Sequence, residues 1–377
     1  MKKYVTLGEV CRINMGQSPD SSTYNKNGEG IPFYQGNADF GEMYPITRHW
    51  CTIPTKVVEK GDILVSVRAP IGALNIATEH CCIGRGLAAI TVNSDMVSRN
   101  YIWYLLKSKV SMLQSLGTGS TFKAINKNVL NELCFQLSSL TEQDKISMTL
   151  KKVDLIIRNC TEILGGLDLL IKSQFVEMFG DIRISSIFPN ISLDNFAQIG
   201  SSKRVHAADY VESGIPFYRS KEIIELGNGQ EPSVELFISK KQYECIRKTN
   251  GVPCKGDILM SAVGTIGKMW IVDGQKDFYY KDGNIISIHS EETNPIYLKE
   301  ALANLIDDFK SANVAGSAYS ALTIVKLKKM TVPMPPISLQ NEFADFVQQI
   351  DKSKLAVKKT LEKAETLKKT LMQEYFG

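Results

Sequence analysis

The sequence lacks the residue pairs and apolar runs that identify several protein classes. No Cys-X-X-Cys occurs among its eight cysteines, and its four histidines are scattered, which argues against a Cys/His zinc site. We therefore expect reduced thiols and no bound metal. No apolar run approaches the ~18 residues of a membrane-spanning helix, and the first residues lack the apolar core of a signal peptide. These absences predict a cytoplasmic protein.

Motifs for nucleotide binding and for methyl transfer are also missing. The only Pro-Pro pair, at 335–336, precedes an apolar-periodic segment and is not part of an Asn-Pro-Pro-Tyr-like methyltransferase motif. The nearest match to a phosphate loop, GTIGK at 264–268, has the wrong spacing. We identify no catalytic residue, no cofactor-binding residue and no cofactor of the chain itself.

Charge alone does not identify a partner. The net charge is +4, and it is spread unevenly along the chain. Residues 1–139 carry 14 Lys and Arg against 10 Asp and Glu, whereas residues 181–336 carry 18 of each. A DNA-binding protein of this composition must gather its basic residues on one face.

An internal repeat of ~190 residues is the most informative feature. The pentapeptide GIPFY occurs at 30–34 and again at 214–218, and KGDILVSVRAPIG at 60–72 recurs as KGDILMSAVGTIG at 255–267. Further along, GSTFKAI at 119–125 matches GSAYSAL at 316–322, and SSLTEQDKI at 138–146 matches PPISLQNEF at 335–343. The same order of blocks in both copies predicts a molecule with pseudo-two-fold internal symmetry.

Each copy divides into a globular part and a long helix. Short β-branched runs punctuated by Gly and Pro predict strands, and helices are expected at 98–115 and 295–309. The fold class is therefore α+β, with two tandem mixed α/β domains separated by two long helices. We expect a first head at 1–139, a central helix at 140–180, a second head at 181–336 and a distal helix at 337–377. In both heads the Gly-Asp pair is interpreted as a structural turn, with Asp62 and Asp257 as turn residues.

The two long helices carry apolar residues at alternating spacings of four and three, which is typical of a coiled coil. In the central helix these are Ile146, Leu150, Val153, Ile157, Cys160, Leu164, Leu167 and Ile171. In the distal helix they are Phe343, Val347, Ile350, Val357, Leu361, Ala364 and Leu371, interrupted by Lys354 and Lys368. Either the lysines lie in the seam and fix its register, or the helix rotates so that Leu355 and Leu367 face the seam.

A single helix of ~30 residues cannot bury such a stripe, so the two copies are the expected partners. Either orientation is sterically possible, because a whole domain connects them. Antiparallel pairing would place the heads at opposite ends of a rod ~45 Å long. Half-sites one turn of DNA apart lie ~34 Å from centre to centre, so a rod of this length is comparable with their separation.

The quoted blocks resemble the specificity (S) subunits of type I restriction-modification enzymes, over essentially the whole chain. The resemblance implies that each head recognises one part of a bipartite double-stranded DNA site, while an antiparallel coiled coil sets the spacing. It also implies that the helices dock two methyltransferase (M) subunits, that restriction (R) subunits can join, and that AdoMet, ATP and Mg²⁺ are bound only by those partners.

DNA recognition needs Arg, Lys, Asn and Gln at base edges, with hydroxyls and cations at phosphates. Polar loops that carry such residues supply the candidates. In the first head these are Gln17, Ser18, Tyr24, Gln35, Asn37, Arg68, Arg85, Ser120 and Lys123; in the second they are Ser201, Lys203, Arg204, Arg219, Lys221, Asn284, Ser317 and Tyr319.

Two other functions remain open from the residues alone. A two-headed scaffold that bridges protein or glycan partners would have the same duplicated architecture, but would not bind duplex DNA in a salt-dependent way. A self-sufficient modification enzyme would need an AdoMet site, which we do not find in the sequence.

Overall fold

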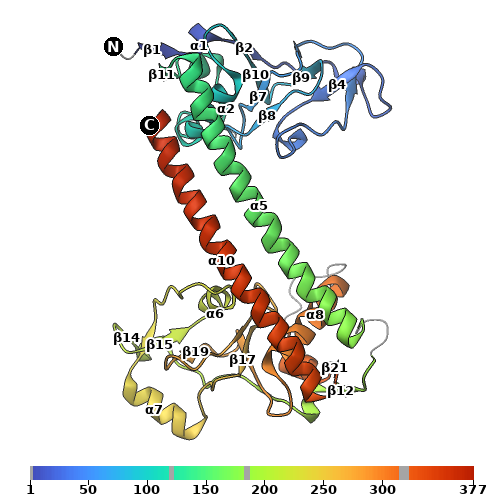
Figure 1. The fold of residues 1–377 in the computed structure, drawn as a ribbon, viewed down its shortest axis with the longest axis vertical. Coiled ribbons are helices and arrows are strands. Elements are labelled where there is room, and N and C mark those ends of the chain that lie inside the picture. The colour runs from blue at the N-terminus through green and yellow to red at the C-terminus, as the bar shows by residue number, and fades with distance from the viewer. Residues whose placement is uncertain (1–2, 119–122, 182–186, 314–321) are drawn as a thin grey trace. The chain divides into compact units, whose positions relative to one another are not determined.

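The chain folds into two compact units, each built from helices and strands (Figure 1). A computed structural model describes residues 3–118, 123–181, 187–313 and 322–377. The first unit comprises residues 1–162 and 358–377, and the second comprises residues 163–357. Both units therefore mix helix and sheet, as predicted, and each of the two long helices contributes one part to each unit.

The first unit contains three sheets and a group of helices. Its strands are β1 (Lys3–Thr6), β2 (Cys11–Met15), β3 (Tyr24–Asn25), β4 (Ile31–Tyr34), β5 (Trp50–Cys51), β6 (Val57–Val58), β7 (Ile63–Ser66), β8 (Leu74–Ile76), β9 (Cys81–Ile83), β10 (Leu87–Val92) and β11 (Cys134–Leu137). Its helices are α1 (Leu7–Val10), α2 (Arg99–Ser108), α3 (Val110–Ser115), α4 (Lys127–Asn131) and the first part of α5 (Leu140–Phe179).

The strands of the first unit follow a mixed topology. One sheet has the order β2-β10-β7-β8 and is antiparallel throughout. A second has the order β3-β5-β4-β9-β6, in which β4 and β9 are parallel. The strand β7 is buried along its whole length, consistent with its uninterrupted run of Ile, Leu and Val. The position of this buried central strand determines where the loop after it, which contains Arg68, leaves the sheet.

The second unit repeats this plan with one strand fewer. Its strands are β12 (Asn190–Ser192), β13 (Gln198–Gly200), β14 (Tyr210–Val211), β15 (Ile215–Tyr218), β16 (Phe237–Ile238), β17 (Ile258–Ser261), β18 (Met269–Ile271), β19 (Tyr279–Tyr280), β20 (Ile285–His289) and β21 (Thr331–Pro333). Its helices are α6 (Ser220–Gly227), α7 (Lys240–Thr249), α8 (Pro295–Asn313), α9 (Ile324–Lys328) and the first part of α10 (Ile337–Phe376). The sheet β13-β20-β17-β18 corresponds to β2-β10-β7-β8, and β14-β16-β15-β19 corresponds to the second sheet without its β6.

The Lys-Gly-Asp turn before the central strand has the same structure in both units. Gly61 and Gly256 have φ values of 95° and 94°, which a residue with a side chain rarely adopts. The carboxylate of Asp62 accepts a hydrogen bond from the Glu59 N–H at 3.1 Å, and that of Asp257 accepts one from Cys254 N–H at 2.8 Å. Both aspartates are turn residues, as predicted.

A buried glutamine attaches each long helix to its own head. Gln143 and Gln340 are 0% and 1% exposed and occupy matching places in the repeat. Gln143 Oε1 accepts the Ser98 N–H at 2.8 Å, and Gln340 Oε1 accepts the Asn294 N–H at 2.9 Å. The start of α5 is therefore held to the start of α2, and the start of α10 to the start of α8, by the same kind of hydrogen bond.

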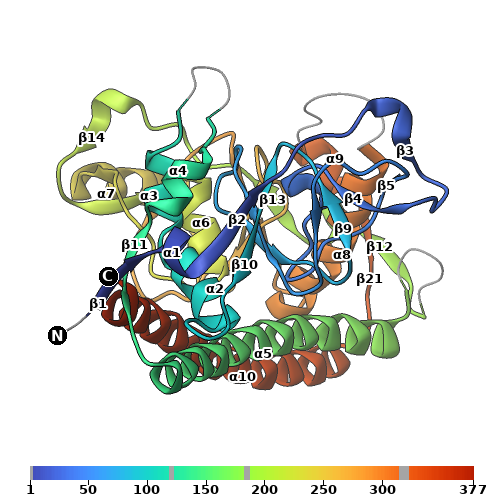
Figure 2. The ribbon, with the colours of Figure 1, turned by 90° about the horizontal axis from the view of Figure 1, so that it is seen from above.

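In the first unit, the beginning of α5 lies beside the end of α10 (Figures 1 and 2). Ile146 and Leu150 share one core with Phe376, whose ring centroid lies 5.1 Å from that of Tyr101. Across the same contact, Lys368 Nζ lies 2.6 Å from Asp154 Oδ1.

In the second unit, the end of α5 lies beside the beginning of α10. Phe175 contacts Phe343 edge-on at 5.5 Å and stacks on Tyr297 of α8 at 5.7 Å, so an aromatic cluster joins both helices to the head. Here Lys354 Nζ lies 2.6 Å from Asp168 Oδ1.

The two lysines of α10 lie in the helix contact. Their side chains are only 16% exposed for Lys354 and 30% for Lys368, whereas Leu355 and Leu367 are 51% and 49% exposed. Of the two arrangements open from the sequence, the structure therefore has the lysines in the seam. All the apolar residues predicted for the seam are buried or half-buried.

Candidate nucleic-acid interface

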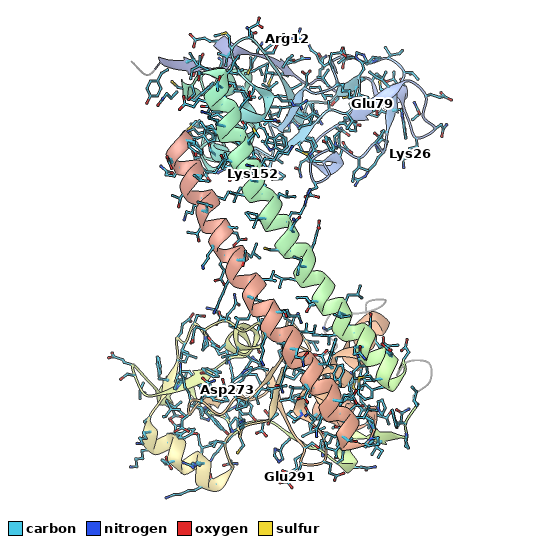
Figure 3. The ribbon with its side chains drawn as sticks, in the orientation of Figure 1. Arg12, Lys26, Glu79, Lys152, Asp273 and Glu291 are labelled. Atoms are coloured by element: carbon cyan, nitrogen blue, oxygen red, sulfur yellow. The ribbon has the colours of Figure 1, made fainter. Side chains whose placement is uncertain are left out.

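Six of the predicted DNA-binding residues of the first head come from five segments. They lie in the loops that follow β2, β4, β7 and β9 and in the segment before α4: Gln17, Ser18, Gln35, Arg68, Arg85 and Lys123. The loops after β4 and β9 are neighbours because those two strands are parallel, so both leave the sheet at the same edge. Figure 3 shows the side chains of this head, including Arg12 on β2 and Lys26 after β3.

Backbone hydrogen bonds join these loops to one another. The Gly86 N–H donates to Gln35 O at 3.2 Å, and the Gly86 carbonyl accepts the Val67 N–H at 3.0 Å. The Arg85 N–H donates to Ser18 Oγ at 3.4 Å. The loops after β2, β4, β7 and β9 therefore form a single connected surface.

The segment before α4 joins the same surface. Arg68 forms an isolated β-bridge with Ala124, and the Ala69 N–H donates to Lys123 O at 3.2 Å. Arg68 and Lys123 lie 55 positions apart in the sequence. This bridge holds their two backbone segments side by side.

Two glycines permit the close approach of these loops. A Cβ at Gly16 would lie 2.2 Å from the Gly84 carbonyl oxygen, and a Cβ at Gly86 would lie 2.6 Å from that of Gln35. Both contacts are shorter than any side chain tolerates, so the Gly-Arg-Gly sequence at 84–86 reflects backbone packing.

The cations of this surface are exposed and unpaired. Arg68, Arg85 and Lys123 form no ion pair with any residue that the structure describes. Their charges are therefore available to phosphates or base edges of a nucleic acid. Among the other candidates, Asn37 begins a short 3₁₀ turn, and Tyr24 packs its ring on Phe33 while its hydroxyl donates to Pro19 O at 2.8 Å.

The second head brings together the corresponding segments. The Ala262 N–H donates to Asn284 O at 2.8 Å, as Val67 does to Gly86 in the first head, and Gly283 N–H donates to Ser201 Oγ at 3.2 Å. The Lys281 N–H donates to Tyr218 O at 2.9 Å. The candidates Ser201, Lys203, Arg204, Arg219, Lys221 and Asn284 thus lie on or beside these joined loops.

Unlike the three cations of the first head, Arg204, Arg219 and Lys221 of the second head are paired with carboxylates. Arg204 Nε lies 2.8 Å from Asp282 Oδ2. Arg219 is held by Glu222 at 2.7 Å and by Glu235 at 3.0 Å. The side chain of Glu222 is 1% exposed, and its hydrogen bond raises the pKa of Arg219 above its usual value. Glu235 also pairs with Lys221 at 3.1 Å.

Three candidates lie outside the described residues. They are Ser120 in the first head and Ser317 and Tyr319 in the second.

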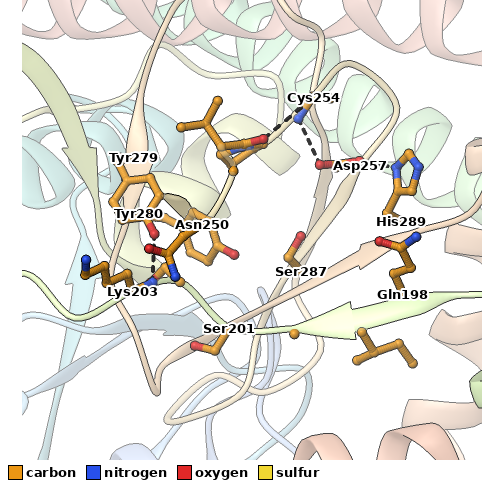
Figure 4. Close-up of a pocket in the computed structure, with 16 residues that line it drawn as sticks. Gln198, Ser201, Lys203, Asn250, Cys254, Asp257, Tyr279, Tyr280, Ser287 and His289 are labelled. Atoms are coloured by element: carbon orange, nitrogen blue, oxygen red, sulfur yellow. Dashed lines mark hydrogen bonds and ion pairs between the residues drawn. The ribbon is translucent and has the colours of Figure 1, made fainter. Parts of the chain in front are cut away.

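A pocket of about 490 Å³ borders the candidate surface of the second head (Figure 4). Lys203 and Tyr279 line it, and Lys203 N–H donates to the Tyr279 hydroxyl at 2.7 Å. On another side His289 Nδ1 lies 2.7 Å from Asp257 Oδ1. In the first head strand β6 pairs with β9 at the corresponding place, whereas residues 250–254 form no strand.

Two residues in the sequence explain why the second head has this pocket where the first head has strand β6. Aligning the two Lys-Gly-Asp turns places Gly251 and Pro253 opposite Lys56 and Val58. Glycine and proline weaken a strand, and proline cannot donate to its ladder. The loss of one edge strand follows from these two residues.

No metal-binding cluster occurs among the described residues, where no three His, Cys, Asp or Glu side chains come together suitably. All eight cysteines are free, and burial raises the pKa of Cys11 and of Cys81 to about 12. Within the described ranges, none of the helices combines the length and apolar character of a membrane-spanning segment.

Helix α5 exposes a second apolar stripe outside its contact with α10. Seven large side chains on it are between 43% and 65% exposed: Met148, Leu155 and Ile156 in the first unit, and Ile163, Leu169, Leu170 and Val176 in the second. Several recur every seven residues, which keeps them on one side of the helix. The seven-residue period of this stripe is present in the sequence beside the stronger period of the helix contact.

Comparison with protein families identifies a match over most of the chain. The family model described as the type I restriction modification DNA specificity domain matches residues 2–166 and again residues 188–366. The two matches correspond to the two copies of the internal repeat.

Individual relatives are similar over different lengths. A putative type I restriction enzyme MjaX specificity subunit of Methanocaldococcus jannaschii is 47% identical over 155 residues, covering 41% of this chain and 36% of its own length. A putative type I specificity subunit of Haemophilus influenzae is 24% identical over 357 residues, covering 92% of this chain and 86% of its own. The crystal structure of the S subunit from M. genitalium shares the fold, with a TM-score of 0.61 at 18% identity over 100% of this chain and 96% of that one.

Proposed function

The chain belongs to the family of type I restriction-modification DNA specificity proteins, and from this premise we propose that it recognises a bipartite site on double-stranded DNA. Each head, at 1–139 and 181–336, recognises one half of the site. The chain carries no catalysis itself, and AdoMet, ATP and Mg²⁺ belong to its partners.

The connected loop surface of the first head is the observation that carries this proposal. Its exposed cations, Arg68, Arg85 and Lys123, meet from separate segments and have no carboxylate partner among the described residues. Exposed Arg and Lys side chains with Gln and Ser beside them match what phosphate contact and base recognition require. In the second head, Glu222 holds Arg219 in a fixed position, which suits recognition by a planar guanidinium.

The two long helices act as the spacer between the heads in this proposal. Within each unit, segments of α5 and α10 pack through the predicted apolar residues and one Lys–Asp pair. An antiparallel coiled coil over residues 140–180 and 337–377 extends these contacts along both helices. Its length then sets the number of base pairs between the half-sites.

The exposed stripe of α5 is the proposed docking face for methyltransferase subunits. Exposed large apolar residues in a contiguous row mark protein interfaces, because water hydrates them poorly. The stripe has residues in both units, which is consistent with two M subunits, and restriction subunits join through them.

Removing the free cations of the first head tests DNA binding. We expect Arg68→Ala, Arg85→Ala and Lys123→Ala together to weaken binding of the assembled complex to a duplex carrying its site. The slope of log K against log salt should fall by about 0.9 for each cation that contacts a phosphate. Fluorescence anisotropy at several salt concentrations measures both quantities.

The matched control removes three exposed lysines from α10, namely Lys359, Lys363 and Lys369. It changes the net charge equally and should leave the slope nearly unchanged. If both variants lower the slope alike, the cations of the first head have no special role. If the parent complex shows no salt-dependent duplex binding, the result favours the scaffold that bridges protein or glycan partners.

A further inference from the structure

Two ion pairs of the same composition lie in the contact between the long helices. In the first unit Lys368 pairs with Asp154, and in the second Lys354 pairs with Asp168, each at 2.6 Å. In both pairs the lysine comes from α10, the aspartate comes from α5, and the lysine is the more buried partner of the second pair.

The spacing of the pairs matches on the two helices. Asp154 and Asp168 are 14 residues apart, and so are Lys354 and Lys368. Fourteen residues are two heptads, so equivalent positions of a seam recur at this distance. Because the order is reversed between the helices, one antiparallel register forms both pairs at once.

Displacement by one heptad would break both pairs. Movement of α10 in one direction would bring Lys354 beside Phe175, and movement in the other would leave Asp168 beside Val347. Both residues are buried in the aromatic and aliphatic core of the second unit. Lys354, whose side chain is 16% exposed, would then lose its partner without regaining full hydration. Apart from the aromatic contacts that Phe175 and Phe376 make at the two helix ends, the apolar seam offers little discrimination, since Leu, Ile and Val tolerate one another.

Neighbouring groups fix the charged atoms in position. The Tyr104 hydroxyl of α2 donates to Asp154 Oδ2 at 2.9 Å, which ties this aspartate to the first head. Lys354 is also 3.6 Å from Asp351, one turn earlier on its own helix. Polar residues at isolated seam positions are known to specify register at some cost in stability.

We propose that the pairs Asp154–Lys368 and Asp168–Lys354 determine the register of the two helices and thereby the spacer length of the recognised DNA site. This inference rests on the proposed function. Each head is fastened to the start of its own long helix by Gln143 or Gln340, so sliding one helix along the other changes the distance between the heads. The four charged residues are positioning residues and contact no base.

A shift of one heptad has a calculable effect on the spacer. Seven residues at ~1.5 Å rise amount to ~10 Å. With a base-pair rise of ~3.4 Å, this displacement corresponds to about three base pairs.

Two quadruple variants of the full chain, expressed with their methyltransferase subunits, test the inference by genome-wide adenine-methylation sequencing. The first replaces all four residues by leucine: Asp154→Leu, Lys368→Leu, Asp168→Leu and Lys354→Leu. The second exchanges the charges: Asp154→Lys, Lys368→Asp, Asp168→Lys and Lys354→Asp. Thermal unfolding of each purified complex establishes that the variants fold.

We expect the leucine variant to be as stable as the parent and to methylate the same half-sites at more than one spacer length. The exchanged variant should retain the single parental spacer, because it preserves charge complementarity between α5 and α10. A folded leucine variant that keeps one parental spacer overturns the inference, and so does a folded exchanged variant that loses it. If the parent chain itself directs no split motif, the proposed function fails instead.

Discussion

Exchanging residues 181–336 for the corresponding domain of another specificity subunit is expected to change one half of the recognised DNA site and to leave the other half unchanged. The two heads have separate cores, each built around its own central strand, β7 or β17. The loops that carry the candidate residues are joined by hydrogen bonds within each head. Recognition by one head therefore depends on contacts internal to that head.

The effect on the changed half-site should be large. Each mismatched base pair costs about 1–3 kcal/mol, so a half-site with three altered positions loses roughly a hundredfold or more in affinity. Methylation sequencing of cells that express the exchanged chain gives the new motif directly. Changes in both halves would contradict independent recognition, and an unchanged motif would place recognition outside residues 181–336.

Charging the exposed stripe of α5 should release the methyltransferase subunits. Leu169 and Leu170 are 65% and 44% exposed, and they lie outside the helix contact. We expect Leu169→Glu with Leu170→Glu to reduce affinity for the methyltransferase subunit about a thousandfold. The estimate takes ~2 kcal/mol for each hot-spot position and 1.4 kcal/mol for each factor of ten. Co-purification and cellular methylation should both be lost.

Ile53→Glu is the matched control for this change. Ile53 is 67% exposed, close to the value for Leu169, but it belongs to a loop of the first head. Its replacement adds one glutamate, against two in the α5 variant, at an apolar position as exposed as Leu169, and should leave co-purification intact. If the α5 variant still co-purifies at the parental level while folded, methyltransferase docking lies on another surface.

The repeat made much of the fold predictable from the sequence. Local periodicity placed the long helices, and the repeated Lys-Gly-Asp block identified equivalent turns in the two heads. Periodicity could not decide whether Lys354 and Lys368 lie in the helix contact or face away from it. A lysine enters a seam only if a carboxylate on the other helix faces it, and that depends on helix orientation.

The loop surface shows a second limit of sequence reasoning. Each candidate was chosen for its chemistry, but the segments of Gln35, Arg68 and Arg85 are joined only because β4 and β9 pair in parallel and the Val67 N–H, after β7, donates to Gly86 O. Such non-local pairing leaves no periodic trace in the sequence. Asp282, the partner of Arg204, and Glu235, the second partner of Arg219, were missed for the same reason, since both lie in other loops.

Adenine-methylation sequencing of cells with and without this gene tests the central claim most directly. The account predicts one split motif, with two specified halves and a fixed spacer, that is methylated only when the gene is present and returns when it is restored. If no split motif disappears on deletion, while the methyltransferase subunits are expressed, the chain does not direct DNA recognition and the account is contradicted.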